Sequence, residues 1–427
     1  MTERAPNRPN VIIIGGGFGG LYAAKRLSGE AVDVTLVDRK NHHTFQPLLY
    51  QVALAVLSPG EIASPLRHIV RKSANVKTLL AEVSGFDTHA RRVKLTDGAQ
   101  LAYDYLIVAA GARHSYFGHD DWEQQAPGLK TIEDAVEIRR RLLLAFEKAE
   151  REALLERRRD PVTVAIVGGG PTGVELAGAI ADLARMALAK DFKLIDTTKA
   201  RVRLYEGGPR VLGTFSEESS RRAKEQLQEL GVEVFTGGMV TAVEPGRIRV
   251  ADQWITTDVT LWATGVAASP LGKALETKTD RAGRVLIEPD LSVPGHREIF
   301  VIGDMSALTG QDGKPVPGLA AAATQQGKAA AENILRDLRG ESRRPFTYRD
   351  RGTMATVGYH RAVAELGGRQ LSGVVAWLLW SLVHVALLIG FRNRIAVMGQ
   401  WIWAYATRTG SSPLITEYHS PPRQRTD

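Results

Sequence analysis

Short apolar runs rich in β-branched residues recur along the first three quarters of the chain, and most of them end in glycine or an acidic residue. Such runs, bounded by turn-forming residues, are typical of buried strands in a parallel sheet. Two of them, at 11–15 and 162–168, lead directly into glycine-rich turns and then into helical patterns. Further strands are predicted at 33–38, 103–111, 201–206, 261–266 and 298–304.

Helical periodicity occupies several of the intervals between these strands. Helices are predicted from the first glycine turn to Leu27, over 173 to about 188, and over 324–333. A long helix is predicted over 131–159, because Thr131 and Asp134 stand in capping-box positions and dense charge keeps one face in water. The strand–helix–strand succession occurs twice, so the sequence predicts an α/β fold with two Rossmann-like dinucleotide-binding domains.

A glycine fingerprint stands in each of these two units, between the predicted strand and the predicted helix. Its glycines permit a tight turn, let the backbone approach a pyrophosphate, and bring the helix close to the strand. The helix N-terminus then offers amide donors to phosphate. Two copies predict two bound dinucleotides, and hence a protein that passes electrons between them. The glycines are Gly15, Gly17, Gly19 and Gly20 in the first copy and Gly168, Gly170 and Gly173 in the second.

Acidic residues stand where the ribose of each dinucleotide is expected. Asp38 and Glu206 end the strands that follow the two fingerprints, a position at which a carboxylate accepts hydrogen bonds from ribose hydroxyls. A carboxylate at 206 also repels a 2′-phosphate, which favours NADH over NADPH. Arg201, Arg203 and Arg210 lie nearby in the sequence, so the pattern indicates a preference for NADH and not exclusivity.

Three later strands end in small residues, which suit a cofactor pressed against the backbone or simply tight packing. Ala110 and Gly111 end the first, Gly265 lies in the ending of the second, and Gly303 and Asp304 end the third. The glycine–aspartate pair offers close backbone approach and a carboxylate for the polar middle of a long cofactor. That combination fits FAD better than NAD.

The chain contains no cysteine, which excludes a thiol–disulfide relay, a persulfide site and an iron–sulfur centre. Redox chemistry is therefore expected from bound cofactors, and no metal site is expected. The formal charge is +8, and residues 336–427 hold 13 Arg, no Lys and 6 Asp or Glu. No basic run interleaved with aromatics precedes them, so nucleic acid is not an expected partner. Residues 1–10 lack an apolar stretch, and no signal peptide is predicted.

The basic C-terminal part contains a long apolar segment at 371–391 with no Asp, Glu, Lys or Arg. A helix of this length would span about 30 Å, the thickness of a bilayer core. Arg392, Arg394 and a second apolar stretch at 395–405 follow, and four of the seven tryptophans lie here, as in interfacial segments. The residues alone are compatible with either a membrane-spanning or an interfacial segment. The arginines predict contact with anionic lipid.

The chain resembles the type II NADH dehydrogenases, single-subunit flavoproteins that reduce membrane quinone without pumping protons. The resemblance covers most of the chain, and its discriminating stretches are HHTFQPLLYQVA at 42–53, PGLAAAATQQG at 317–327 and the C-terminal apolar segment. It implies a flavin disulfide reductase-like architecture with FAD on the first fingerprint and NADH on the second. It also implies that Glu175 lies close to the nicotinamide and flavin rings, although a helix-start glutamate is common for dipole reasons alone.

The resemblance further implies a quinone entrance built from a motif Ala-Gln-x-Ala-x-Gln, which reads AAAATQ at 320–325 here. Ala321 replaces the first glutamine, whereas Gln325 is retained as a donor to a quinone carbonyl. Gln325 and Gln326 are also compatible with a helix-capping or surface role. An apolar turn is a second candidate for the wall of the quinone site. The same turn is equally compatible with a buried packing loop. Its candidate residues are Gln46, Pro47, Leu48 and Tyr50.

The resemblance favours a monotopic C-terminal segment, frequently dimeric, at the cytoplasmic face of the inner membrane. The expected function is a non-electrogenic NADH:quinone oxidoreductase of the respiratory chain, with FAD and NADH as cofactors. The alternatives are a soluble ferredoxin reductase-type flavoprotein and a non-catalytic redox sensor that binds both nucleotides. The expected domains are an FAD-binding domain at 8–115 and 285–345, a connecting segment at 116–160, an NADH-binding domain at 161–284, and a membrane-anchoring and dimerisation region at 346–427.

Overall fold

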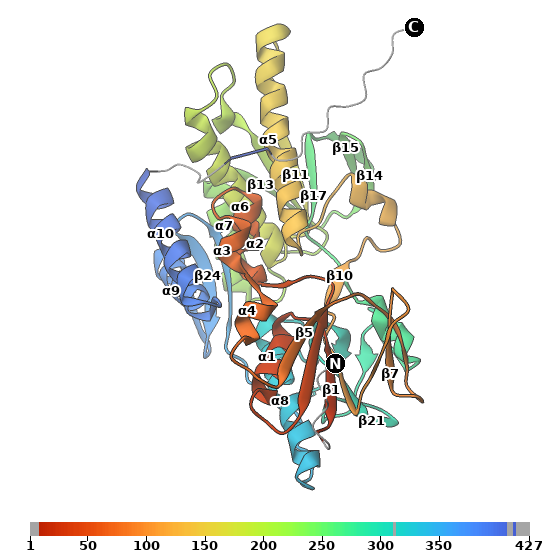
Figure 1. Ribbon diagram of the computed structural model, residues 1–427. Helices are drawn as coiled ribbons and strands as arrows, with labels where there is room; N and C mark the ends of the chain where they lie inside the picture. Colours follow the sequence, from red (N-terminus) through yellow and green to blue (C-terminus); the bar gives the residue numbers. More distant parts are fainter. Residues whose placement is uncertain (1–7, 311–312, 408–412, 416–427) are drawn as a thin grey trace. The chain divides into compact units, whose positions relative to one another are not determined.

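Two compact units make up the chain (Figure 1), of which the computed structural model describes residues 8–310, 313–407 and 413–415. Each unit contains one of the two expected parallel sheets, so the predicted α/β class is confirmed. The segment 45–62 groups with the second unit, although both of its neighbouring segments belong to the first. The first unit is Met1–Thr44, Ala63–His114 and Val266–Arg351; the second is Phe45–Ile62, Ser115–Gly265 and Gly352–Asp427.

The first unit is built on a six-stranded sheet with the order β20-β21-β9-β1-β2-β5, parallel except between β20 and β21. The apolar run of β1 is buried on both faces, as a central parallel strand requires. Helices α1 and α8 touch where a Cβ on Gly327 would lie 2.1 Å from the carbonyl oxygen of Gly19. These elements are β1 Asn10–Ile14, α1 Phe18–Leu27, β2 Asp33–Asp38, β5 Val76–Leu80, β9 Tyr105–Val108, β20 Ser292–Val293, β21 His296–Val301 and α8 Ala320–Leu338.

Smaller elements complete the first unit. A three-stranded antiparallel sheet, β6-β7-β8, and three two-stranded pairings, β3 with β4, β10 with β18 and β19 with β22, surround the main sheet. Their bounds are β3 His42–Thr44, β4 Ala63–Pro65, α4 Leu66–Val70, β6 Val83–Asp87, β7 Arg92–Leu95, β8 Gln100–Ala102, β10 Ala112–His114, β18 Val266–Ala268, β19 Val285–Leu286 and β22 Ser306–Ala307, with 3₁₀ turns at Pro270–Leu275 and Gly303–Met305.

The second unit contains a four-stranded parallel sheet with the order β13-β12-β11-β17 and a three-stranded antiparallel sheet β14-β15-β16. Helix α5 begins with a complete capping box between Thr131 and Asp134, as predicted. The bounds are α2 Leu49–Ala53, α3 Pro59–Ile62, α5 Ile132–Leu155, β11 Thr163–Val167, α6 Pro171–Asp182, β12 Arg201–Glu206, α7 Glu217–Glu229, β13 Val232–Thr236, β14 Val240–Glu244, β15 Arg247–Val250, β16 Gln253–Thr256 and β17 Val259–Trp262, with 3₁₀ turns at Gln46–Leu48, Asp120–Gln124 and Thr197–Lys199.

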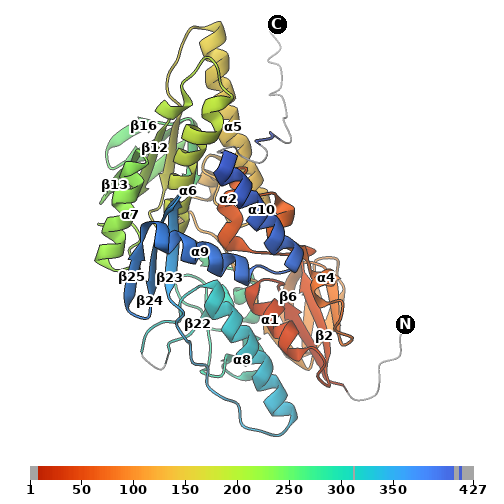
Figure 2. The same cartoon turned by 90° about the vertical axis from the view of Figure 1, so that its left-hand side faces the viewer.

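The C-terminal part of the second unit is a three-stranded antiparallel sheet covered by helix α9, with helix α10 beside it (Figure 2). The apolar segment at 371–391 is therefore not one helix, because it begins in a strand and α9 ends at Leu387. In the described part of the chain, no helix is both long and apolar enough to cross a membrane. The bounds are β23 Thr353–Gly358, β24 Arg361–Leu366, β25 Arg369–Ser372, α9 Gly373–Leu387 and α10 Phe391–Thr407.

Helix α6 is shorter than the sequence predicts. The pattern favours a helix to about 188, but α6 ends at Asp182 and continues as a π-helical turn over Leu183–Ala187 and a 3₁₀ turn over Leu188–Lys190. The apolar periodicity does continue through these turns, which explains the overestimate. The helix predicted at 324–333 is the middle of the longer α8.

Helix α6 rests directly on the backbone of β23. A Cβ built on Gly178 would lie 1.4 Å from the carbonyl oxygen of Val357, a distance that no side chain tolerates. Glycine at this point is therefore required for the helix and the strand to meet. The contact joins the fingerprint helix to the C-terminal sheet within the second unit.

We predict that Gly178→Ala destabilises the protein by about 2 kcal/mol or more, because the methyl group forces α6 away from β23. The melting temperature should fall by roughly 5 °C. The matched control is Gly399→Ala in α10, where a built Cβ meets nothing within 4 Å. An equal response of the two variants in a thermal melt would show that the Val357 contact is unimportant.

Candidate functional site

The turn between β1 and α1 forms the first nucleotide cradle. Gly15 has φ +99°, and a Cβ on Gly20 would lie 1.9 Å from the carbonyl oxygen of Gly15, so neither position accepts a side chain. Nothing lies within 4 Å of a Cβ built on Gly17, the N-cap of α1. Asp38 accepts hydrogen bonds from the amides of Gly16 (2.5 Å) and Lys40 (2.7 Å). The turn fits the pyrophosphate and ribose of a dinucleotide such as FAD.

A second group of the expected flavin residues lies in the same unit, around the end of β21. Gly303 has φ +70°, and its amide donates to Oε1 of Gln326 at 2.6 Å. Gln326 is buried and also bonds to the Ser306 hydroxyl, so it fixes the turn that carries Asp304. The Gln326 carboxamide, a quinone-site candidate from the sequence, is therefore already engaged in this contact. Gly111 has φ +69° and follows Ala110 after the end of β9, the strand beside β21.

The turn between β11 and α6 repeats the cradle in the second unit. Gly168 has φ +110°, and a Cβ on Gly173 would lie 1.8 Å from the carbonyl oxygen of Gly168. Glu206 accepts from the amides of Gly169 and Gly208, both at 2.6 Å. The N-cap of α6 is Gly170, and Gly265, with φ +72°, lies in the turn after β17, which neighbours β11. These features fit a second dinucleotide.

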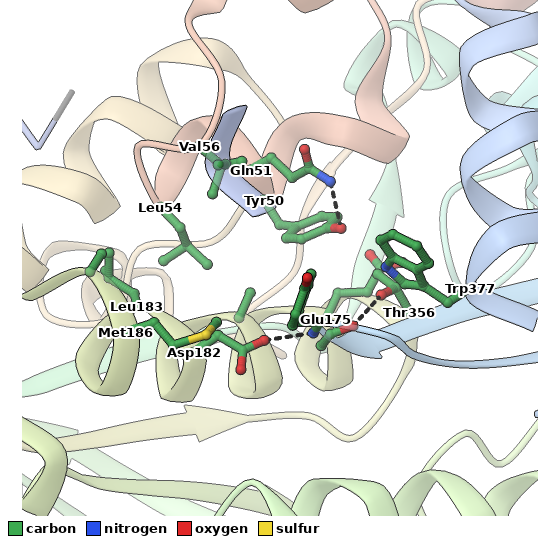
Figure 3. A pocket seen from close by; sticks show the side chains of 15 residues that line it. Tyr50, Gln51, Leu54, Val56, Glu175, Asp182, Leu183, Met186, Thr356 and Trp377 are labelled. Carbon is green, nitrogen blue, oxygen red and sulfur yellow. Dashed lines mark hydrogen bonds between the residues drawn. The ribbon is translucent and has the colours of Figure 1, made fainter. Parts of the chain in front are cut away.

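An apolar cavity of about 110 Å³ lies along α6 in the second unit (Figure 3). Glu175 lines it, two residues after the last fingerprint glycine, and the backbone amide of Thr356 bonds to its carboxylate. Desolvation outweighs this bond and raises the pKa of Glu175 to about 8. The carboxyl group is therefore protonated and neutral at pH 7.

A second carboxyl group, Asp182, lines the same cavity. Its Oδ2 accepts from the amide of Tyr359 at 2.7 Å. Burial raises the pKa of Asp182 to about 6, against the lowering effect of that bond and of Arg361 and Arg185. Two carboxyl groups with raised pKa values in one cavity are a feature of functional sites more often than of structural ones.

Helix α2 closes the cavity from the other side through a hydrogen-bonded series. The indole nitrogen of Trp401 donates to Oε1 of Gln51 at 2.7 Å, and Nε2 of Gln51 donates to the Tyr50 hydroxyl at 2.9 Å. Trp380 packs on both Tyr50 and Trp401, with ring centroids 6.4 and 5.8 Å apart. This series links α10 to the wall of the cavity.

Two family models match the chain. The pyridine nucleotide-disulphide oxidoreductase model matches residues 9–327, and the NDH2 C-terminal domain model matches residues 351–407. The chain is 45% identical to the type II NADH:quinone oxidoreductase Ndh of Mycobacterium tuberculosis, over 99% of this chain and 94% of the relative. This chain belongs to the type II NADH:quinone oxidoreductases.

More distant similarities support the same family assignment. The type II NADH:quinone oxidoreductase of Staphylococcus haemolyticus is 30% identical over 86% of this chain and 92% of its own length. The solved structure of NDH2 from Plasmodium falciparum in complex with NADH superposes with a TM-score of 0.87, over 96% of this chain and all of that chain. Its sequence identity of 20% makes this a likeness of fold. The resemblance identified from the sequence is confirmed.

The quinone-site candidates of this type II NADH:quinone oxidoreductase fall in both units. Ala321, Gln325 and Gln326 belong to the first, and Gln46 to Tyr50 to the second. The Gln325 carboxamide exchanges two hydrogen bonds of 3.0 Å with the backbone of Arg349. Gln46 is exposed, and its side chain donates to the Lys130 carbonyl at 3.3 Å. Pro47 is half-buried and Leu48 is buried, whereas Tyr50 lines the carboxyl cavity.

Sequence reasoning missed several cavity residues of this type II NADH:quinone oxidoreductase. Asp182 was detectable, because it follows Glu175 by seven residues and so lies on the same face of the predicted helix. Gln51 and Trp377, which line the cavity, carried no comparable signal, and neither did Trp401, which bonds to Gln51, since all three come from distant segments. Their roles depend on tertiary contacts, as the Trp401–Gln51 bond shows.

We predict that Glu175→Gln changes the pH dependence of stability. The folded-state pKa of about 8 lies above the ordinary 4.5, so the folded protein holds a proton that the unfolded chain releases. The Glu175 carboxyl therefore lowers the free energy of unfolding as pH rises from about 4.5 to about 8. Glutamine does not titrate, so the melting temperature of the variant minus that of the native protein should be larger at pH 8 than at pH 5. An unchanged difference across this range contradicts the prediction.

Proposed function

We propose that this chain oxidises NADH and reduces a membrane quinone, with FAD as the resident cofactor. The observation that supports this most is the presence, in one chain, of two glycine cradles that each hold a carboxylate and of a segment that matches the NDH2 C-terminal domain model. When bound, FAD supplies the two-electron chemistry between NADH and quinone. The proposed FAD ligands are Gly15, Gly17, Gly19, Gly20, Asp38, Ala110, Gly111, Gly303 and Asp304, and the proposed NADH ligands are Gly168, Gly170, Gly173, Glu206 and Gly265.

The residues of the chain have separable tasks in this proposal. The amides at the N-termini of α1 and α6 bind pyrophosphate, and Asp38 and Glu206 orient the riboses. Glu175, protonated at neutral pH, holds a proton available for the quinone. Gln326 acts by holding the Gly303 turn in place. Gln325 exchanges its hydrogen bonds with Arg349 for the quinone and so acts on the quinone side.

The C-terminal helices are proposed as the membrane-facing surface. Arg392 and Arg394 are exposed in the first turn of α10, as binding to anionic headgroups requires. We propose a monotopic seat on the cytoplasmic face of the inner membrane, with part of the same surface joining a second copy in a homodimer. The exposed apolar side chains are Val374, Val375, Leu378, Leu382, Leu387, Phe391, Ile395, Met398, Ile402 and Trp403.

The deciding experiment is steady-state NADH oxidation by the purified, FAD-loaded full chain with a short-chain quinone. We predict quinone-dependent turnover with formation of quinol. A soluble ferredoxin reductase would instead pass electrons to ferredoxin and leave quinone unreduced. A redox sensor would show flavin bleaching by NADH in stopped flow and no reoxidation by any quinone. Either of these results, with intact flavin, contradicts the proposal.

We predict that Glu206→Gln weakens the preference for NADH over NADPH by about tenfold in kcat/KM, because the variant loses the charge that repels a 2′-phosphate. The melting temperature should fall modestly, since the single carbonyl oxygen of glutamine can accept only one of the two bonds from the amides of Gly169 and Gly208. The control is Glu244→Gln, an exposed carboxylate of β14 paired with Arg247. Nucleotide preference that responds equally in the two variants would exclude a role for Glu206 in recognition.

A further inference from the structure

Glu175 and Asp182 stand two turns apart on one face of α6 and open into one cavity (Figure 3). Seven residues of α-helix correspond to a rise of about 10 Å. The two side chains flank Gly178, the residue at which the helix touches Val357. On the facing segment, Thr356 and Tyr359 flank Val357 and present their backbone amides to the two carboxyl groups. The contact between Gly178 and Val357 thus aligns both carboxyl groups along the same cavity.

The cavity between them has room for water. Its volume of about 110 Å³ is several times the roughly 15 Å³ that one water molecule needs. The two carboxyl groups, Tyr50 and Gln51 give polar partners along a lining that is otherwise apolar. A few waters in the cavity could bridge the two carboxyl groups through hydrogen bonds and so connect them.

We propose that Asp182 relays protons from solvent to Glu175 through this cavity and thereby resupplies the proton that quinone reduction consumes. Asp182 touches neither substrate nor cofactor in this role, because it acts through Glu175. The inference rests on the proposed function, since only a reaction that consumes protons needs the relay.

The reaction balances with one proton from solvent per turnover. NADH, one proton and the quinone give NAD⁺ and quinol, so two electrons leave NADH and enter the quinone. The solvent proton first forms an O–H bond on the Asp182 carboxylate. That bond breaks as the proton crosses the cavity to an ionised Glu175, whose O–H bond breaks in turn when the proton joins the quinol oxygen. No additional oxidant or reductant is required.

The charges around the two groups favour this direction. Arg361 on β24 and Arg185 on the π-helical turn act on Asp182, and both keep its carboxylate form accessible at neutral pH. Around Glu175, the facing groups are the Thr356 amide, Tyr50 and Gln51 from α2, and Trp377 from α9. Because the pKa of Glu175 is raised to about 8 and that of Asp182 to about 6, a proton moves downhill from Asp182 to Glu175.

The chain changes its winding directly after Asp182. The π-helical turn Leu183–Ala187 follows at once, and its Leu183, Met186 and Ala187 line the cavity. Turns of this kind are rare and occur frequently at functional sites. Here the turn keeps Leu183 and Met186 on the cavity side next to Asp182.

The test is Asp182→Asn in the FAD-loaded full chain, with NADH and a short-chain quinone. Asparagine retains an acceptor for the Tyr359 amide, so folding should persist, which thermal melting and flavin content would verify. We expect the quinone-dependent kcat to fall about tenfold at pH 8 and much less at pH 5.5, because direct protonation of Glu175 is then proportional to the proton concentration. Flavin bleaching by NADH in stopped flow should change less than twofold.

Three further measurements separate a relay from a structural role. The solvent deuterium isotope effect on kcat should increase in Asp182→Asn, and a small weak acid such as formate should restore turnover at pH 8. Asp182→Glu should recover most of the activity, because it restores the titrating group. The matched control Asp191→Asn, an exposed carboxylate beyond the π-helical turn, should behave as the native protein does.

Full quinone turnover by Asp182→Asn at pH 8 would overturn the relay. An equal loss at all pH values without formate rescue would also overturn it, because that pattern indicates altered structure. A native protein that is bleached by NADH but never reoxidised by quinone overturns the proposed function itself, and that result is visible before any variant is made.

Discussion

Backbone-to-backbone contact without an intervening Cβ is the constraint on which this structure depends. In each cradle the fingerprint helix returns onto its own strand turn, at Gly20 on Gly15 and at Gly173 on Gly168. The same kind of contact recurs between other elements, where Gly327 of α8 meets Gly19 of α1 and Gly178 of α6 meets Val357 of β23. Side chains at these points would separate the helices from their supports by ångströms, and interiors packed at crystal density cannot absorb such shifts. The glycines therefore set the geometry of both fingerprint turns and of the part of α6 that carries Glu175 and Asp182.

The two carboxyl groups of the cavity show how desolvation and local partners together set a pKa. An ionised carboxylate in an apolar cavity is strongly disfavoured, and a protein usually responds by shifting its pKa. Glu175 has one backbone amide partner and stays neutral at pH 7, whereas Asp182 has an amide and two nearby arginines and stays closer to ionisation. The two environments separate the pKa values of two residues on one helix. Such separation is what assigns donor and acceptor in proton transfer.

The sequence predicted the elements whose determinants are local. The strands at 33–38 and 201–206 coincide with β2 and β12, and the Thr131 capping box starts α5 where expected. The predicted end of the helix that became α6 was wrong, because apolar spacing does not distinguish an α-helix from a π-helix. The segment at 371–391 was divided by glycines at 373 and 390 with positive φ, which hydropathy does not register. The spacing from Glu175 marks Asp182 on the same helix face, but its bond to the Tyr359 amide could not be predicted, because the two residues lie 177 positions apart.

Helix α10 has two faces with different partners. Its outward side chains, among them Ile402 and Trp403, are apolar and exposed, whereas the neighbouring Trp401 is buried and bonds to Gln51. Gln51 in turn fixes the Tyr50 hydroxyl at the cavity wall. A displacement of α10 would therefore break the Trp401–Gln51 bond and release Tyr50, leaving the buried Gln51 carbonyl oxygen without its donor, at a cost of about 1–3 kcal/mol. The element that presents the apolar surface thus also maintains the shape of the cavity beside Glu175.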